Sequence, residues 1–285
     1  MEQIKKAFGM LQENWVLLIP IYLTRLIPAL LGIYIFSEIS TELVTMLSVE
    51  EIGETQHVLE NYEQVTRDFF QANRDYILAS VIVALLGLLM NFIAVPATVG
   101  MIKENLEQGE KLDFSRIVPN AGRYFVRYLL YRIGKLALWI FFFLLSILIV
   151  ALVAFGGSMV DEGMAVLLVM LLGLALILVA VLLHLILKLW FPAMVLEDLG
   201  VFEGLKEAFR KSKICFWPLF AGFLGIRITA WVANMFVNMI IGDSAYLGSF
   251  INNVIPTVAT VALLIFYLLI YRKTQKELVN TEESG

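Results

Sequence analysis

Long apolar runs separated by shorter polar segments dominate the pattern of this chain. Each run has about 20–26 residues, enough for a helix of ~30 Å or more, which matches the hydrocarbon thickness of a bilayer. The runs cover residues 15–36, 76–101, 133–155, 164–189, 217–241 and 251–271. The pattern predicts an all-α fold in which six transmembrane helices form a bundle.

The order of segments also repeats, because an amphipathic segment, an apolar run, a loop and a second apolar run occur three times. Residues 4–8 read IKKAF and residues 205–209 read LKEAF. Each is followed by a tryptophan and, ten residues later, an arginine: Trp15 and Arg25, then Trp217 and Arg227. We therefore predict three pseudo-repeats, each an amphipathic helix followed by a hairpin.

Basic residues lie almost entirely on one side of the predicted membrane. The other side has two, Arg67 and Arg74, beside twelve acids. These acids are Glu38, Glu42, Glu50, Glu51, Glu54, Glu60, Glu63, Asp68, Asp75, Asp161, Glu162 and Asp243. Because basic loops stay in the cytoplasm, both termini are predicted to be cytoplasmic, in a prokaryotic plasma membrane.

The whole chain, residues 1–285, is predicted to be a single integral membrane domain. Its parts outside the bilayer are an interfacial helix at 1–14, an extracytoplasmic acidic segment at 37–75, cytoplasmic interfacial connections at 102–132 and 190–216, and a cytoplasmic tail at 272–285. In the acidic segment, Ser48 and Glu51 fit a capping box, which predicts one or two short amphipathic helices. These would form a lid, a docking surface or a solvated cap.

Composition agrees with a membrane protein. Hydrophobic residues make up 60% of the chain and mean hydropathy is +0.84, whereas soluble domains are about 45–50% apolar. The one cysteine, Cys215, excludes an intramolecular disulfide. The apolar run that follows Lys5 and Lys6 is too long for a signal peptide, so we expect it to remain as an anchor.

Polar residues inside the apolar runs are the candidate binding residues, because charge is costly in hydrocarbon. Arg227 begins a stripe along one face of its helix, and Arg25 lies between two prolines. The candidate anion or lipid site comprises Arg25, Asn91, Arg227, Trp231, Asn234 and Asn238. The alternative is structural, with the arginines paired to backbone carbonyls or amides and the amides joining helices. Polar seams predict that runs one, two, five and six face an interior, and that three and four face lipid.

Signatures of other chemistry are absent from the sequence. His57 and His184 have no second ligand at metal spacing, and no nucleotide-binding or hydrolase motif occurs. We therefore expect no catalytic residue, no metal and no cofactor. Basic and aromatic residues interleave in 112–132, but at the end of a membrane span this favours an interfacial helix over nucleic-acid binding.

Residues 191–212, FPAMVLEDLGVFEGLKEAFRKS, carry a resemblance to a family. This stretch resembles one in prokaryotic polytopic proteins related to the membrane domain of glycerophosphoryl diester phosphodiesterases. There, an apolar span ends in proline and a carboxylate before an amphipathic helix leads into the next span. The phosphodiesterase barrel of some members is absent, so the resemblance implies a membrane module without assigned chemistry.

Together these features predict a non-enzymatic membrane protein that binds or moves a lipid or another anionic amphiphile, or supports an envelope or transport assembly. Membrane lipids are the expected partners. One alternative is an accessory subunit that docks a membrane protein through its amphipathic helices and outer acidic segment. Another is an intramembrane enzyme that modifies a lipid.

Overall fold

The computed structural model describes residues 2–47, 67, 71, 73–109, 111–157, 162–241 and 245–283. Its α-helices are α1 (Glu2–Glu13), α2 (Leu18–Leu47), α5 (Arg74–Gln108), α6 (Ile117–Gly157), α7 (Glu162–Leu196), α8 (Val201–Ile241), α9 (Ala245–Asn252) and α10 (Val254–Glu283). Short 3₁₀ turns at Trp15–Leu17 and Phe114–Arg116 precede α2 and α6. No strand occurs in these ranges.

The prediction of an all-α chain with six helices able to cross a membrane is confirmed for the described residues. The three pseudo-repeats and the orientation of the termini stay predictions. The connections 102–132 and 190–216 are largely helical: α5 continues to Gln108, and residues 117–130 and 201–213 are the first parts of α6 and α8. The capping box at Ser48–Glu51 lies outside the described residues.

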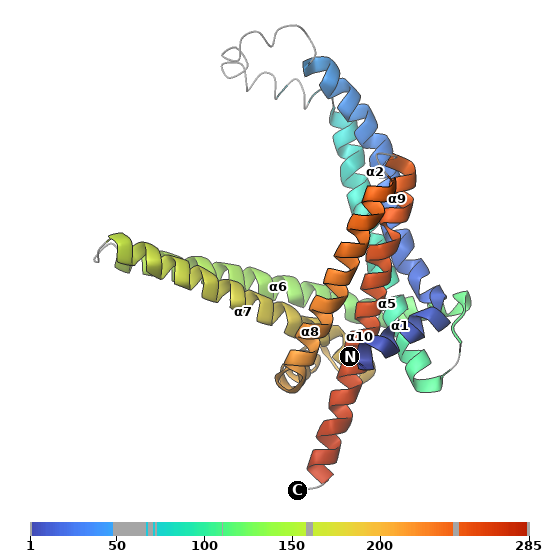
Figure 1. Cartoon of the computed structure of the whole chain (residues 1–285), viewed down its shortest axis with the longest axis vertical. Helices are drawn as coiled ribbons and strands as arrows, with labels where there is room; N and C mark the ends of the chain where they lie inside the picture. The colour runs from blue at the N-terminus through green and yellow to red at the C-terminus, as the bar shows by residue number, and fades with distance from the viewer. Residues whose placement is uncertain are drawn as a thin grey trace.

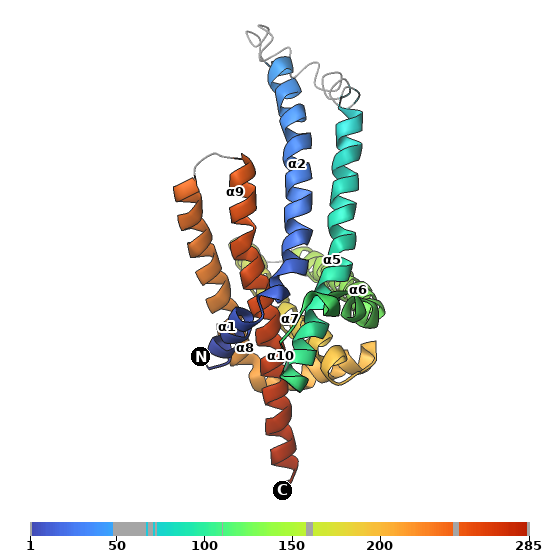
Figure 2. The same cartoon turned by 90° about the vertical axis from the view of Figure 1, so that its right-hand side faces the viewer.

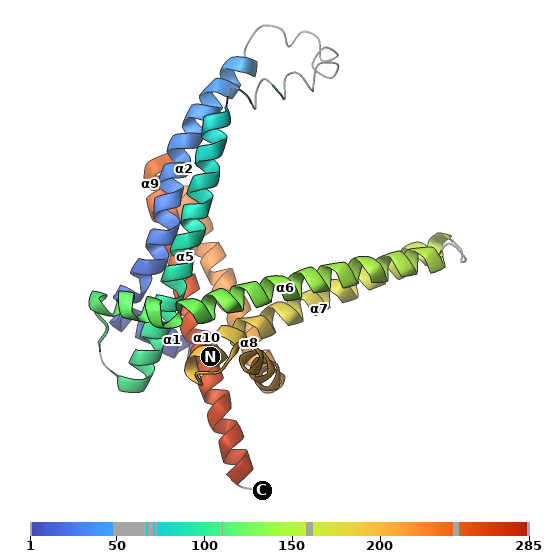
Figure 3. The same ribbon diagram turned by 180° about the vertical axis from the view of Figure 1, so that it is seen from behind.

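The six long helices form three hairpins that share one base and diverge beyond it (Figure 1). One hairpin is α2 with α5, the second is α6 with α7, and the third is α8 with α9 and α10. Figure 2 shows α2 and α5 rising together beside α8 and α9. Figure 3 shows α6 and α7 running together away from α2 and α5. The helices of each hairpin run side by side, and α9 also lies beside α2. All three hairpins come together at the base, where the N-terminal end lies, while the end of α10 projects beyond it (Figure 1).

The far parts of α6 and α7 carry large apolar side chains that are mostly exposed, such as Phe141 at 65% and Leu174 at 65%. Such surfaces suit lipid tails, because lipid is as apolar as leucine and helices gain little by hiding them from it. The far parts of runs three and four thus fit the predicted position facing lipid, but runs two and five, predicted to face an interior, are also mostly exposed. In contrast, α10 is the most buried of the six helices.

Aromatic side chains fill the base. Trp190, at 2% exposed, donates a hydrogen bond from Nε1 to the Val201 carbonyl at 2.7 Å, which ties the end of α7 to the start of α8. Gly134 on α6 makes room for this ring, since a Cβ there would lie 2.6 Å from it. Tyr131 and Phe191 stack nearby with ring centroids 5.5 Å apart. The base is thus the rigid part that positions polar side chains from every hairpin.

Candidate anion-binding cavity

A first group of basic side chains at the base is paired with acids; we call it the paired cluster (Lys103, Arg127, Glu197, Asp198 and Lys211). Lys103 lies 3.2 Å from one Asp198 oxygen, and Arg127 lies 2.6 Å from the other. Both bases also donate to carbonyls at the end of α7, Lys103 to Val195 and Arg127 to Met194. One carboxylate therefore joins α5, α6 and the loop after α7.

Asp198 is held in an unusual backbone conformation, with φ of 53°. Aspartate tolerates this left-handed region better than most residues, because its short side chain can bond locally. The hydrogen bond from Arg127 is the main cause that lowers the pKa of Asp198, and Lys103 adds to it. The carboxylate is therefore charged at neutral pH and pairs with both bases.

Lys211 on α8 is the buried half of the second ion pair in this cluster. Its side chain is 1% exposed and its ammonium contacts the Glu197 carboxylate, with Glu207 at 3.7 Å. The same ammonium lies 3.7 Å from the centroid of the Tyr271 ring, a distance that permits a cation–π contact. A lysine so buried is stable only because its charge is compensated on several sides.

Further along α6, α7 and α8 there is a cavity of about 150 Å³, lined also by α5 and α10. Its wall includes apolar and aromatic side chains: Val95, Tyr128, Tyr131, Phe191, Pro192, Leu263, Leu264 and Tyr267. Four basic residues share it: Arg132, Lys135, Lys188 and Arg227. We call these four the unpaired cluster.

The unpaired cluster differs from the paired one in having no acid. No Asp or Glu lines the cavity, and none of the four bases forms an ion pair within the described part of the chain. Lys188 lies within electrostatic range of Lys135, Arg227 and Arg132. Their charges therefore repel one another, and an anion in the cavity would relieve that repulsion.

Aromatic rings and hydroxyls complete the wall. Arg132 lies 5.8 Å from the Tyr128 ring and Lys135 lies 5.7 Å from the Tyr131 ring. Such contacts contribute about 0.5–2 kcal/mol, less than a full counter-ion in a dry site. Tyr267 is 3% exposed, yet its hydroxyl has no hydrogen-bond partner among the described residues. A buried polar group of this kind needs a hydrogen-bond partner, which a ligand atom or a water molecule can supply.

The two arginines singled out from the sequence meet here. Arg227 lines the cavity, and Arg25 donates to the Thr260 hydroxyl at 2.7 Å, while Thr260 itself lines the cavity. Arg25 also lies within electrostatic range of Arg227. The structural alternative expected a backbone carbonyl or an asparagine as the partner of Arg25, whereas the structure pairs it with a threonine on α10.

The other four candidates lie elsewhere. Asn91 donates to the Gly87 carbonyl of its own helix at 3.3 Å. Trp231, Asn234 and Asn238 share a separate hollow with two methionines on the outer part of α8. Three members of the predicted stripe thus share one hollow, and the fourth, Arg227, lines the cavity.

Four residues of the cavity were not predicted as site residues from the sequence: Arg132, Lys135, Lys188 and Tyr267. A signal was present for two of them, because Lys135 and Lys188 fall inside the apolar runs 133–155 and 164–189. A lysine near the end of a run is usually read as reaching the interface, so it carries less weight than a central arginine. Which helix faces converge is a tertiary fact.

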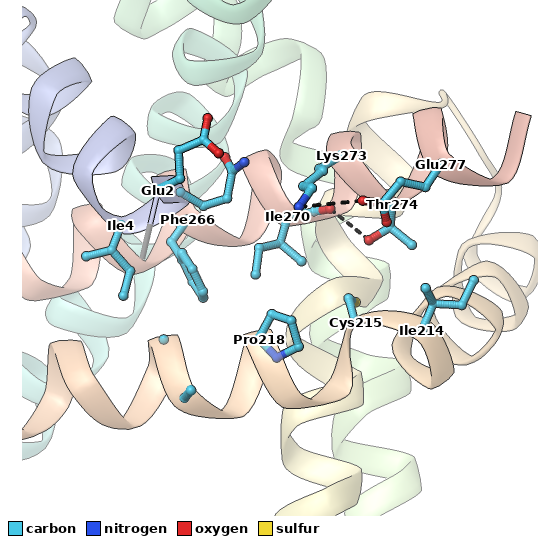
Figure 4. A pocket seen from close by; sticks show the side chains of 13 residues that line it. Glu2, Ile4, Ile214, Cys215, Pro218, Phe266, Ile270, Lys273, Thr274 and Glu277 are labelled. Carbon is cyan, nitrogen blue, oxygen red and sulfur yellow. Dashed lines mark hydrogen bonds and ion pairs between the residues drawn. The ribbon is translucent and has the colours of Figure 1, made fainter. Parts of the chain in front are cut away.

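A larger cavity of about 330 Å³ lies between α1, α8 and α10 (Figure 4). Its floor includes Phe266 and Ile270, and its rim carries Glu2, Lys273 and Glu277. Here the charges are balanced within the protein, since Lys273 lies 3.5 Å from Glu277 and Glu2 lies 2.8 Å from Lys6. It offers an anion no excess of positive charge.

Comparison with protein-family models, with curated proteins and with solved structures found no match for this chain. The resemblance of residues 191–212 to the phosphodiesterase-related membrane domain therefore stays a prediction. Within the fold, this stretch includes Val201, whose carbonyl accepts the hydrogen bond from Trp190, and both acids of the paired cluster, Glu197 and Asp198. Function must be argued from the cavity.

Proposed function

We propose that this protein binds an anionic amphiphile, with the charged group of the ligand in the cavity of the unpaired cluster. The observation that carries the proposal is the meeting of four basic side chains from three helices in one cavity without a described acid. Charges at membrane depth are usually paired, or mark the path of a substrate or ion. A bound anion would supply the missing counter-charge.

The cavity also suits an amphiphile better than a small free ion. Arg132 and Arg227 are exposed, whereas Tyr131 and Tyr267 are buried behind them. Both arginines therefore reach the surface, and large exposed apolar side chains follow them along α6 and α8; we call these side chains the apolar flank. A ligand could place its charge inside and its apolar chain along this flank.

Orientation follows from the positive-inside rule, and we propose that the base lies toward the cytoplasm of a prokaryotic plasma membrane. The test uses Gln71→Cys and Lys276→Cys, both at exposed positions, in a Cys215→Ser background. An impermeant thiol reagent added to intact cells should label the first and spare the second. The reverse pattern would overturn the orientation.

The binding proposal is tested by native mass spectrometry of gently extracted protein. The wild type should retain an anionic lipid, and Lys188→Gln and Arg227→Gln should each retain much less. Lys213→Gln is the matched control, because Lys213 is exposed on α8 and does not line the cavity. Equal retention of lipid by the wild type and all three variants would end the proposal. Co-purification of a fixed protein partner instead of a lipid would favour the accessory-subunit alternative.

A further inference from the structure

We infer that the ligand of this cavity is a lipid whose headgroup is a terminal phosphate monoester. The inference rests on the proposed function and specifies its ligand. It draws on the charge of the unpaired cluster, the volume of the cavity, the free hydroxyl of Tyr267 and the apolar flank.

Charge is the first argument. Four bases line the cavity, and Arg25 adds positive charge from behind Thr260. A phosphate monoester carries about −1.5 to −2 at pH 7 and has three terminal oxygens that accept strong hydrogen bonds. A phosphodiester carries about −1 and has two such oxygens. The monoester therefore neutralises more of the cluster and offers its bases three oxygens to contact, against two on a diester.

Volume is the second argument. The cavity of about 150 Å³ has room for a phosphate, with its phosphorus and four oxygens. A diester headgroup carries a further polar substituent, such as glycerol. Where this substituent lies against apolar wall residues such as Phe191 and Leu264, it loses water without gaining hydrogen-bond partners.

Hydrogen bonding is the third argument. The Tyr267 hydroxyl is buried and unpartnered within the described residues, and it belongs to the cavity wall. A hydroxyl donates to a phosphate oxygen in a short charge-assisted bond. The neighbouring Tyr131 hydroxyl is already engaged, since it donates to the Leu187 carbonyl at 3.3 Å. Tyr267 is thus the side chain placed to orient the phosphate.

The apolar flank accounts for the remainder of the lipid. Four residues beyond Arg132 on α6, Leu136 is 62% exposed, and four residues beyond Arg227 on α8, Trp231 is 68% exposed. Hydrocarbon chains would lie against these faces, within the bilayer. The phosphate alone, without its chains, should therefore bind more weakly than the lipid.

The experiment titrates delipidated protein with three probes: phosphatidic acid, phosphatidylglycerol with the same acyl chains, and inorganic phosphate. We expect phosphatidic acid to bind about tenfold more tightly than phosphatidylglycerol, the effect of about one additional charge-assisted hydrogen bond. Inorganic phosphate should bind weakest. Equal binding of the two lipids would overturn the monoester inference while leaving the proposed function standing.

Two other outcomes are decisive in different ways. Binding of neither lipid would defeat the proposed function itself. Inorganic phosphate binding as tightly as phosphatidic acid would show that the ligand is a free anion, and would overturn the lipid part of the inference.

A conservative variant sharpens the site assignment. Tyr267→Phe removes one hydroxyl and keeps the ring, so the fold should persist, as a thermal melt can verify. It should weaken phosphatidic acid binding several-fold, whereas Tyr34→Phe, at an exposed position on α2, should not. Unchanged phosphatidic acid affinity in both Tyr267→Phe and Lys188→Gln would place the phosphate elsewhere and overturn the inference.

Discussion

The paired and unpaired clusters both draw on α6 and α8 and differ in where their counter-charge comes from. On α6, Arg127 contacts Asp198, whereas Arg132, little more than one turn further on, has no acid within the described chain. On α8, Lys211 is matched by Glu197, whereas Arg227 is not matched. Acids lie beside the bases of the paired cluster, whereas no Asp or Glu is among the residues that line the cavity.

This difference distinguishes structural from functional charges in this protein. A buried base with an internal acid holds helices together, and losing either partner leaves the other uncompensated. A base without an internal acid gains nothing from the fold alone and is stabilised only when a ligand binds. The two clusters should therefore respond oppositely to loss of charge.

The largest effect is expected at Glu197. Glu197→Gln leaves the buried Lys211 ammonium with the longer contact to Glu207 and the ring of Tyr271, so we expect a loss of about 3 kcal/mol in the free energy of unfolding. Thermal or denaturant unfolding in detergent measures it. The double variant Glu197→Gln with Lys211→Met should recover much of the loss. If the single variant melts like the wild type, the Glu197–Lys211 ion pair does not stabilise the fold.

The second effect concerns Arg227 in the unpaired cluster. In delipidated protein, Arg227→Gln should cause no loss of thermal stability, because it removes a repelled charge that has no acid partner among the described residues. With saturating phosphatidic acid, the wild type should gain about 2.7 kcal/mol at a ligand concentration of 100 Kd, and the variant should gain far less. A large loss of stability without lipid would instead make Arg227 structural.

A smaller effect is expected at Asp198, which is about half exposed, so solvent screens its pairs. Asp198→Asn keeps a residue that tolerates positive φ and should cost about 1 kcal/mol or less at pH 7. Since folding lowers the pKa of Asp198, its contribution is present above the unfolded value of about 3.9 and is lost as pH falls through the folded value. Unfolding at pH 7 and at successively lower pH values should show the difference from wild type shrink as the pH falls below about 3.9.

The smallest effect on stability is expected when the cavity is given its own acid. Leu264→Glu places a carboxylate among the four bases, where its pairing offsets the cost of burying it, so stability should change by about 1 kcal/mol or less. Retention of anionic lipid should nevertheless be lost, because the site is then neutralised from within. Lipid retained at the wild-type level would mean that the bases do not hold it.

Much of the architecture was predictable from local patterns. Length and hydropathy identified six helices able to span a membrane. The strong hydrophobicity of runs three and four is consistent with the exposed faces of α6 and α7. These succeed because the bilayer demands long apolar helices whatever their neighbours are. The rarity of charge in hydrocarbon likewise marked Arg25 and Arg227, and both lie at or beside the cavity.

Only the tertiary structure decided which polar faces meet. The stripe of Trp231, Asn234 and Asn238 shares a face of α8 with Arg227 but lines a separate hollow further along the helix, while Lys188 and Tyr267 come to the cavity from α7 and α10. Periodicity reports which residues share a face of one helix and carries no information on how two helices are rotated against each other. That rotation is set by packing at the base, around side chains such as Trp190. The sequence by itself thus determined what crosses the membrane, and packing determined where its charges converge.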